Sequence, residues 1–157
     1  MSRPLAALLG LILVSAPALA HAQDASVKRR LEDRGVKYQV DADGDFKITY
    51  NYKSEGRTQL VFVSGATESV GGFLVREVFS PAARVDQDGI NGSKALELLK
   101  ESSNNKLGSW EIRGDALYFV IKLPDSINGG ELESAMDIAG EIADNMEKEI
   151  SGARDAL

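Results

Sequence analysis

The chain has very few side chains that could act as nucleophiles, acid–base catalysts or metal ligands. Its 157 residues include no cysteine and a single histidine, His21. That histidine lies in a segment typical of a cleaved export signal, so the mature chain would contain neither residue type. Ser-His-Asp and Cys-His catalysis, the usual zinc sites, structural disulfides and c-type haem are then excluded. The sequence predicts a non-enzymatic protein with no catalytic, cofactor-binding or metal-binding residues.

Three alternating aspartates carry the strongest metal-like pattern. Asp41, Asp43 and Asp45 have the spacing that opens an EF-hand calcium loop. The match stops there, because Phe46 stands where the loop needs a glycine and Tyr52 where it needs a bidentate glutamate. The residues on both sides alternate as strands do, whereas an EF-hand is flanked by helices. A hairpin with an acidic tip explains the pattern.

Carboxylate pairs are the remaining route to catalysis without histidine, and the chain has 24 acidic residues. They are spread over turns and helix faces, and none lies in an apolar strand, where burial would raise its pKa. The pairs Ser93-Lys94 and Lys53-Ser54 are adjacent and lack the spacing of a Ser-x-x-Lys system. A carboxylate-dependent hydrolase is therefore the third of our alternatives.

The first 22 residues follow the plan of a secretory signal. Arg3 precedes an apolar run at 5–14, and Ala20-His21-Ala22 is a small-x-small cleavage site. The run is too short to span a membrane, and no later segment approaches the roughly 20 apolar residues that spanning needs. We expect cleavage after Ala22, a periplasmic or secreted protein, and no membrane insertion of the mature chain.

The mature chain is acidic. Removing residues 1–22 takes one of the 18 basic residues and none of the 24 acidic ones, so the net charge becomes −7. An acidic surface repels phosphate backbones, so we expect no nucleic-acid partner. Residues 23–157 contain no linker or repeat and have the length of a single domain.

Hydropathy patterns predict alternating groups of strands and helices. Apolar residues at every second position indicate strands, and spacings of three and four indicate helices. The order α-β-β-β-(β)-α-β-β-α predicts an α+β fold with one antiparallel sheet covered by helices on at least one face. The expected helices are 25–34, 91–102 and 128–150, and the expected strands are 36–40, 46–52, 58–64, 73–79, 109–113 and 116–123.

The last expected helix has small residues within its apolar stripe. Asn128 can cap its start, while Asp144 is expected on the solvent side with Glu141 and Lys148. Gly140, with Ala139 and Ala143 beside it, allows a close approach of the helix to the sheet or to a second subunit. These three residues, 139, 140 and 143, are candidates for partner binding.

Two strands are apolar on both faces. The segments 60–63 and 116–121 show no alternation, which is typical of central strands. If three helices leave one face of the sheet uncovered, that face would form an apolar patch of the kind that marks a partner surface. Trp110, Tyr118 and Val120 are candidate members of this patch. The alternative is that the helices and an expected loop at 65–72 bury all three.

Several short sequences resemble the YbjN family of bacterial sensory transduction regulators. They are Gly-Arg-Thr-Gln-Leu-Val at 56–61, Leu98-Leu99 followed by Asn104-Asn105, Gly-Ser-Trp-Glu-Ile at 108–112 and Ala-Asp-Asn-Met-Glu at 143–147. That family shares the fold of type III secretion chaperones. The resemblance implies a homodimer that binds other proteins, and it carries over no catalytic or cofactor residue.

The export signal distinguishes this chain from secretion chaperones, which act in the cytoplasm. We therefore expect a protein-binding regulator or chaperone of the cell envelope that buries an apolar segment of its partner. The leading alternative is a small-molecule or lipid carrier with a pocket between the sheet and the helices.

Overall fold

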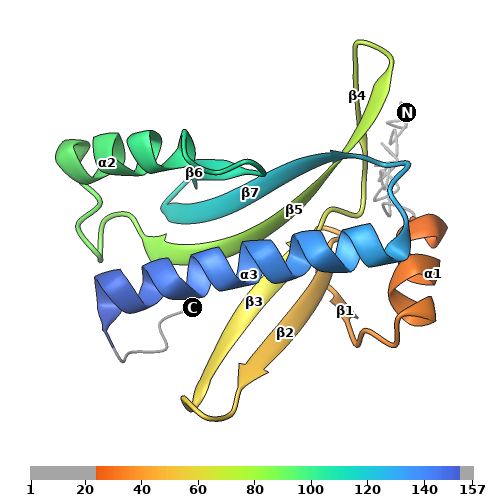
Figure 1. The fold of residues 1–157 in the computed structure, drawn as a ribbon, viewed down its shortest axis with the longest axis horizontal. Coiled ribbons are helices and arrows are strands. Elements are labelled where there is room, and N and C mark those ends of the chain that lie inside the picture. Colours follow the sequence, from red (N-terminus) through yellow and green to blue (C-terminus); the bar gives the residue numbers. More distant parts are fainter. Residues whose placement is uncertain (1–23, 153–157) are drawn as a thin grey trace, which may run out of the picture.

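Seven antiparallel strands form one twisted sheet in the computed structural model, which describes residues 24–152 (Figure 1). Six strands lie in the order β1-β2-β3-β5-β7-β6, and β4 pairs with the outer part of β5. The strands are β1 (Gln39–Val40), β2 (Phe46–Tyr52), β3 (Arg57–Val63), β4 (Glu68–Val70), β5 (Phe73–Arg84), β6 (Ser109–Arg113) and β7 (Ala116–Pro124).

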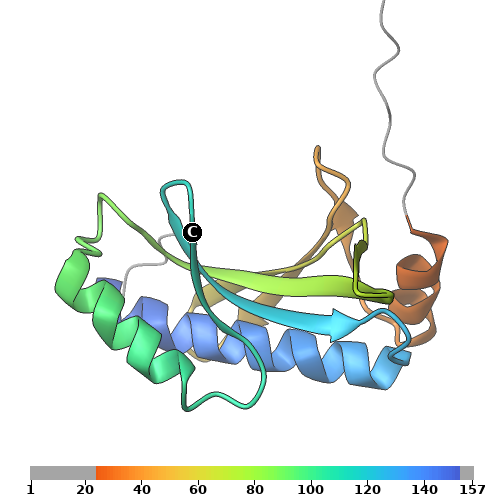
Figure 2. The same ribbon diagram turned by 90° about the horizontal axis from the view of Figure 1, so that it is seen from above.

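Three helices accompany the sheet. Helix α3 (Gly129–Ser151) runs along one face, and α2 (Gly92–Ser102) lies on the same side next to β6 (Figure 2). Helix α1 (Ala25–Asp33) lies against the start of α3. The α+β class and the antiparallel sheet are confirmed, and the expected order of elements is found with one additional short strand, β4.

Side-chain caps fix where the two longer helices begin. The Asn91 side chain accepts hydrogen bonds from the backbone N–H groups of Ser93 and Lys94. Asn128 accepts from the backbone of Glu131, whose carboxylate accepts in return from the Asn128 N–H. This reciprocal capping box satisfies two N–H groups that the helix itself leaves unpaired.

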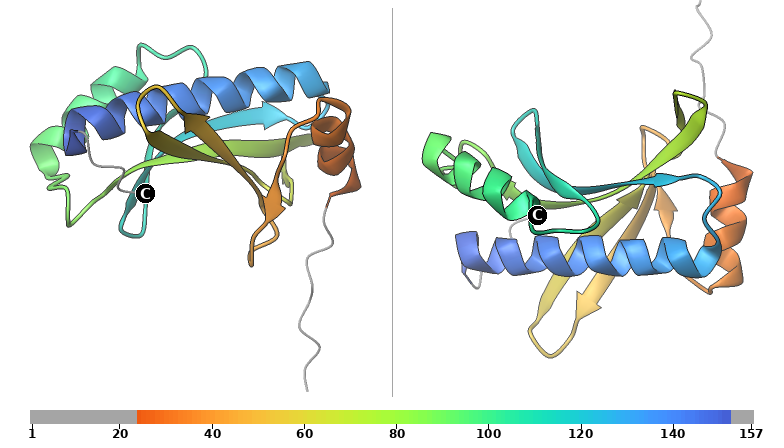
Figure 3. Two further views of the ribbon diagram at one scale, coloured as in Figure 1. Left: turned by 90° about the horizontal axis from the view of Figure 1, so that it is seen from below. Right: turned by 45° about the horizontal axis from the view of Figure 1, so that its top comes forward.

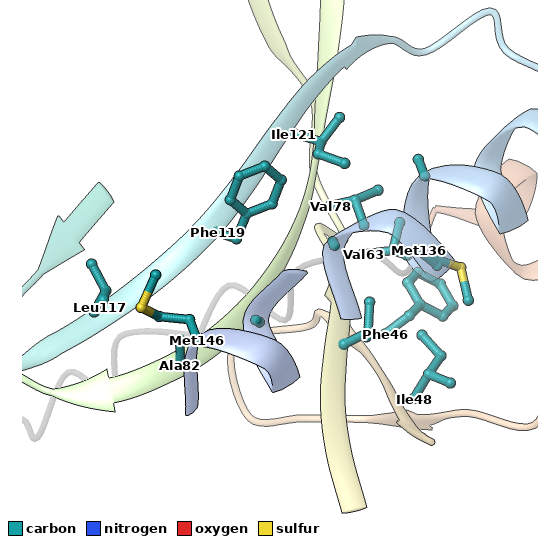
Figure 4. Packing of buried hydrophobic residues seen from close by; sticks show 14 of the residues in the cluster. Phe46, Ile48, Val63, Val78, Ala82, Leu117, Phe119, Ile121, Met136 and Met146 are labelled. Atoms are coloured by element: carbon teal, nitrogen blue, oxygen red, sulfur yellow. The ribbon is translucent and has the colours of Figure 1, made fainter. Parts of the chain in front are cut away.

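The core lies between α3 and the sheet (Figure 4). Register places Phe46 opposite Val63, Val63 opposite Val78, and Val78 opposite Ile121, so these four side chains form one buried row across four strands. Met136 of α3 is also fully buried in this core. The apolar stripe predicted for the last helix therefore faces the sheet.

The fourth strand is longer than expected. Strand β5 continues through Ser80 and Pro81 to Arg84, although the sequence predicted an end at Phe79. A register irregularity lies between Pro81 and Ala83, where the missing proline N–H is tolerated because the ladder is interrupted. The expected loop at 65–72 contains the short strand β4.

Two acids of α3 lie on its buried side. Asp144 is 3% exposed and Glu147 is 1% exposed, so the expectation that Asp144 faces solvent is wrong. The cause is Arg57 of β3, a buried cation whose Nε lies 3.3 Å from Asp144 and whose Nη2 lies 2.9 Å from Glu147. The expected pair between Asp144 and Lys148 is present at 2.6 Å.

Candidate functional site

A row of aromatic rings lies on the sheet face opposite α3. Because side chains alternate along a strand, Phe62 and Phe79 point away from the helix-covered core. Their rings are stacked with centroids 5.2 Å apart, and Tyr118 meets Phe79 edge-on at 5.8 Å. No helix within residues 24–152 crosses this face (Figures 2 and 3). We call these three residues the aromatic row.

Paired charges lie beside the aromatic row on the same face. The guanidinium of Arg113 lies over the Phe79 ring, 5.6 Å from its centroid. It also contacts Glu77 at 2.9 Å and Glu111 at 2.7 Å, and Lys122 contacts Glu111 at 2.7 Å. The surface therefore combines apolar rings with nearly balanced charges of both signs.

Electrostatics favour the ionised forms of Glu111 and Lys122. Burial alone would raise the pKa of Glu111, but hydrogen bonds from Lys122 and Arg113 hold that pKa below its usual value. The hydrogen bond to Glu111 raises the pKa of Lys122. Such a surface matches a segment with apolar side chains, which can pack on the rings, and a few polar groups, which can bond to the paired charges.

Apolar side chains are also exposed on α2 and the neighbouring edge strand. Leu96, Leu99 and Ile112 are 60%, 67% and 49% exposed. We call these three residues the α2–β6 patch. Next to it, a groove of about 260 Å³ is lined by Ala95, Leu98, Leu99, Trp110, Ile112 and Leu117. This patch is separate from the aromatic row because it lies on the helix side of the sheet.

The structure separates the first three predicted partner-binding residues. Tyr118 belongs to the aromatic row, and Val120 shares its face but is only 1% exposed. Trp110 points to the other face, where its ring meets Phe119 edge-on at 5.2 Å and lines the groove beside the α2–β6 patch. Its indole nitrogen is buried without a hydrogen-bond partner.

The three candidates on the last helix lie in the core. Ala139 and Ala143 are 0% exposed, and Gly140 is also buried. A Cβ atom on Gly140 would lie 3.0 Å from Val61 and 3.3 Å from the Tyr50 ring. The close approach that these small residues permit is therefore made to the sheet, the first of the two alternatives that the sequence left open.

Phe62 and Phe79 were missed as site residues, although the sequence contained a usable signal. The tight turn after Arg113 leaves two residues, 114 and 115, between the strands, so Arg113 pairs with Ala116. Counting back along both strands from this pair places Trp110 opposite Phe119. Tyr118 is then on the opposite face from Trp110. Extending this alternation to the neighbouring strands would have selected the two phenylalanines.

The remaining ionic clusters tie elements together. Arg76 of β5 is 1% exposed and pairs with Asp125 at 2.6 Å and with Asp24, the N-cap of α1. Arg30 of α1 reaches the same Asp125 at 2.8 Å. These contacts hold α1 against the end of β7. Asp41 accepts hydrogen bonds from the backbones of Asp43 and Asp45, as a turn residue does.

Within the described residues, no group of three or more acidic or histidine side chains has the arrangement of a metal site. In the same part of the chain, no helix is long and apolar enough to cross a membrane.

Comparison with known proteins shows a similarity of fold. The chain is similar to the type III secretion chaperone SycH of Yersinia pestis, whose structure was solved in complex with a stable fragment of YscM2. The TM-score is 0.52 at 12% sequence identity, over 78% of this chain and 97% of that one. No protein-family model and no curated protein matches the chain. The fold is therefore of the type III secretion chaperone kind.

Proposed function

We propose that the protein is an exported, homodimeric binding module that holds an apolar segment of another protein. Its role would be that of a regulator or chaperone of the cell envelope, as the resemblance to the YbjN family implies. The observation that carries this proposal is the aromatic row, Phe62, Phe79 and Tyr118, on a sheet face that no described helix covers. A fold like that of SycH, a chaperone solved with a protein fragment, supports it.

The aromatic row suits a protein partner for energetic reasons. Aromatic contacts contribute about 0.5–1.5 kcal/mol each beyond the area they bury. The ion pairs of Arg113, Glu111 and Lys122 border the rings and offer hydrogen bonds to the polar groups of a bound segment. The rings would supply most of the binding free energy, and the ion pairs beside them would fix the position and direction of the bound segment.

The homodimer would use the α2–β6 patch. Leu96 and Leu99 occupy adjacent turns of α2, and Ile112 extends the same apolar surface onto the edge strand β6. A two-fold axis through this patch would bring the leucines of two copies together, since both subunits contribute the same surface. The aromatic row would remain free on each subunit.

Affinity capture from an envelope extract tests the function. The mature chain, 23–157, should retain a defined partner, and the double variant Phe62→Ser/Tyr118→Ser should lose at least nine-tenths of it. Leu107→Ser is the matched control, because Leu107 is 45% exposed and lies outside both surfaces. Equal capture by the double variant and the control, with both folded by circular dichroism, would refute the role of the aromatic row.

Two further measurements test the dimer and the export. Native mass spectrometry should show a dimer for the mature chain and a monomer for Leu96→Ser/Leu99→Ser. N-terminal sequencing of protein from the producing cells should start near Gln23, and an intact Met1 would contradict the proposed export.

The structure supports the carrier and hydrolase alternatives less well than the binding module. Core side chains pack between the sheet and α3 (Figure 4). A carrier would have to use the hollows along the edges of α3, which measure about 400 Å³ beside Tyr50 and Asp137 and about 290 Å³ beside Leu123 and Ile138. The buried carboxylates Asp144 and Glu147 are paired with Arg57.

A further inference from the structure

A hairpin projects from the body of the protein and ends in apolar side chains. Strands β4 and β5 pair from Glu68 with Val75 to Val70 with Phe73, and Gly71 and Gly72 form the turn (Figure 1). Both glycines have positive φ, 56° and 90°, as two-residue hairpin turns require. We call residues 68–75 the arm.

Both faces of the arm are apolar at its tip. Val70 and Phe73 are opposite each other and share one face, and they are 55% and 68% exposed. Leu74 points to the other face and is 54% exposed. A flat partner would cover only one of these faces. To bury both apolar faces, a binding partner must therefore surround the tip.

The tip offers no charge by which a partner could be oriented. Residues 70–75 are all glycine or apolar. The next charged residue along β5, Arg76, is 1% exposed and committed to Asp24 and Asp125. Specific protein interfaces surround an apolar centre with polar contacts, whereas insertion into lipid needs only apolar area.

Charges of both signs appear where the arm joins the rest of the sheet. A hollow of about 440 Å³ beside Phe73 has apolar walls that include Val75 and Pro124, and its polar lining consists of Glu68, Glu77 and Lys122. Carboxylates and an ammonium group next to apolar walls complement a zwitterionic headgroup above its acyl chains. The net charge of −6, or −7 after signal removal, disfavours an anionic surface.

We propose that the arm is a membrane-surface anchor whose tip enters the boundary between headgroups and acyl chains of a zwitterionic phospholipid bilayer. Val70, Phe73 and Leu74 enter the lipid, while Glu68 and Lys122 remain at headgroup level. This proposal refines the expectation of no membrane insertion, because only a hairpin tip enters and nothing spans. It does not require the aromatic row or the dimer, although Glu77 and Lys122 border both the aromatic row and the hollow beside Phe73.

Vesicle binding by the mature chain tests the anchor. In co-sedimentation with phosphatidylcholine vesicles, the chain should bind, and Phe73→Ser/Leu74→Ser should bind at least fivefold more weakly. Leu107→Ser, exposed to a similar extent elsewhere, should bind like the unaltered chain. Vesicles rich in phosphatidylglycerol should bind more weakly at low salt.

The absence of cysteine permits a second, site-specific measurement. Ser69→Cys places a single label near the tip without altering the three apolar side chains, and Leu107→Cys is its control. An environment-sensitive dye at position 69, and not at 107, should shift to shorter wavelength when phosphatidylcholine vesicles are added.

Three results would overturn the proposal: no binding to either kind of vesicle, equal binding by the tip variant, or no spectral shift at position 69. A change in oligomeric state of the tip variant without lipid, together with absent vesicle binding, would assign the arm to a second copy of the chain. None of these outcomes bears on the capture experiment with the aromatic-row variant.

Discussion

Replacing Arg57 by methionine should destabilise the fold by about 3–5 kcal/mol, the range for removing one partner of a buried ion pair. The Arg57 side chain is 5% exposed, and its guanidinium contacts Asp144 at 3.3 Å and Glu147 at 2.9 Å. Methionine fills a similar volume but offers no charge. Asp144 would retain Lys148, whereas Glu147, 1% exposed, would lose its ion pair with Arg57.

A double-mutant cycle isolates the contribution of the pair. Free energies of unfolding would be measured by urea denaturation for Arg57→Met, Glu147→Met and the double variant. The double variant should recover at least 2 kcal/mol relative to the sum of the single effects, because apolar residues can replace a buried ion pair at little cost. For a domain with a total stability of about 5–15 kcal/mol, the single change alone would be visible as a large shift in midpoint.

A surface pair provides the control. Lys94 contacts Glu149 at 2.6 Å, but their side chains are 25% and 63% exposed. Breaking that pair with Lys94→Met should cost about 0–1 kcal/mol, as exposed ion pairs do. If Arg57→Met cost no more than Lys94→Met, or if the double variant were as unstable as the sum of the singles, the argument from burial would be refuted.

Three further variants test other elements of the fold by thermal or urea unfolding. Asn128→Ala removes the capping box and should cost about 1 kcal/mol; no change would contradict the assigned cap. Gly140→Val should cost about 1–3 kcal/mol by overpacking against Val61, whereas Gly140 in an open position would tolerate it. Burial would raise the pKa of Asp125, but hydrogen bonds from Arg76 and Arg30 lower it below 3.8. The ionised Asp125 carboxylate stabilises the fold above pH 3.8, and this stabilisation is lost as the pH falls through the lower pKa of the folded state. Below pH 3.8, the stability of Asp125→Asn should therefore decline less steeply than that of the unaltered chain. Parallel declines would count against the pairing.

The helices could be predicted from the sequence because their signals are local. Asn91 and Asn128 precede apolar residues spaced by three and four, and a glycine follows each of the predicted ends at 34 and 150 within two residues. The caps observed at both asparagines satisfy N–H groups within the same turn. No distant part of the chain is needed to decide them.

The buried ions and the length of β5 could not be predicted in the same way. The helical spacing predicts Asp144 on the solvent side, opposite the apolar stripe. Its burial depends on Arg57, which lies on a strand 87 residues away. Ser80-Pro81 predicts a strand end, but Pro81 lies at a register irregularity between paired strands. Both depend on contacts between segments that the hydropathy pattern does not bring together.

The open sheet face links the two-sided apolar pattern to the proposed function. Strands β3, β5 and β7 are central, so their covered face must be apolar to build the core. Their second face does not contribute to this core, so polar side chains there would be compatible with a stable fold. The chain instead places Phe62, Phe79 and Tyr118 in contact with one another and lays Arg113 across the central ring. The Phe79 ring is half-buried, and Arg113 covers part of it. A partner that offers its own carboxylates to Arg113 could uncover that part of the ring. This arrangement supports the proposed binding surface over a second core.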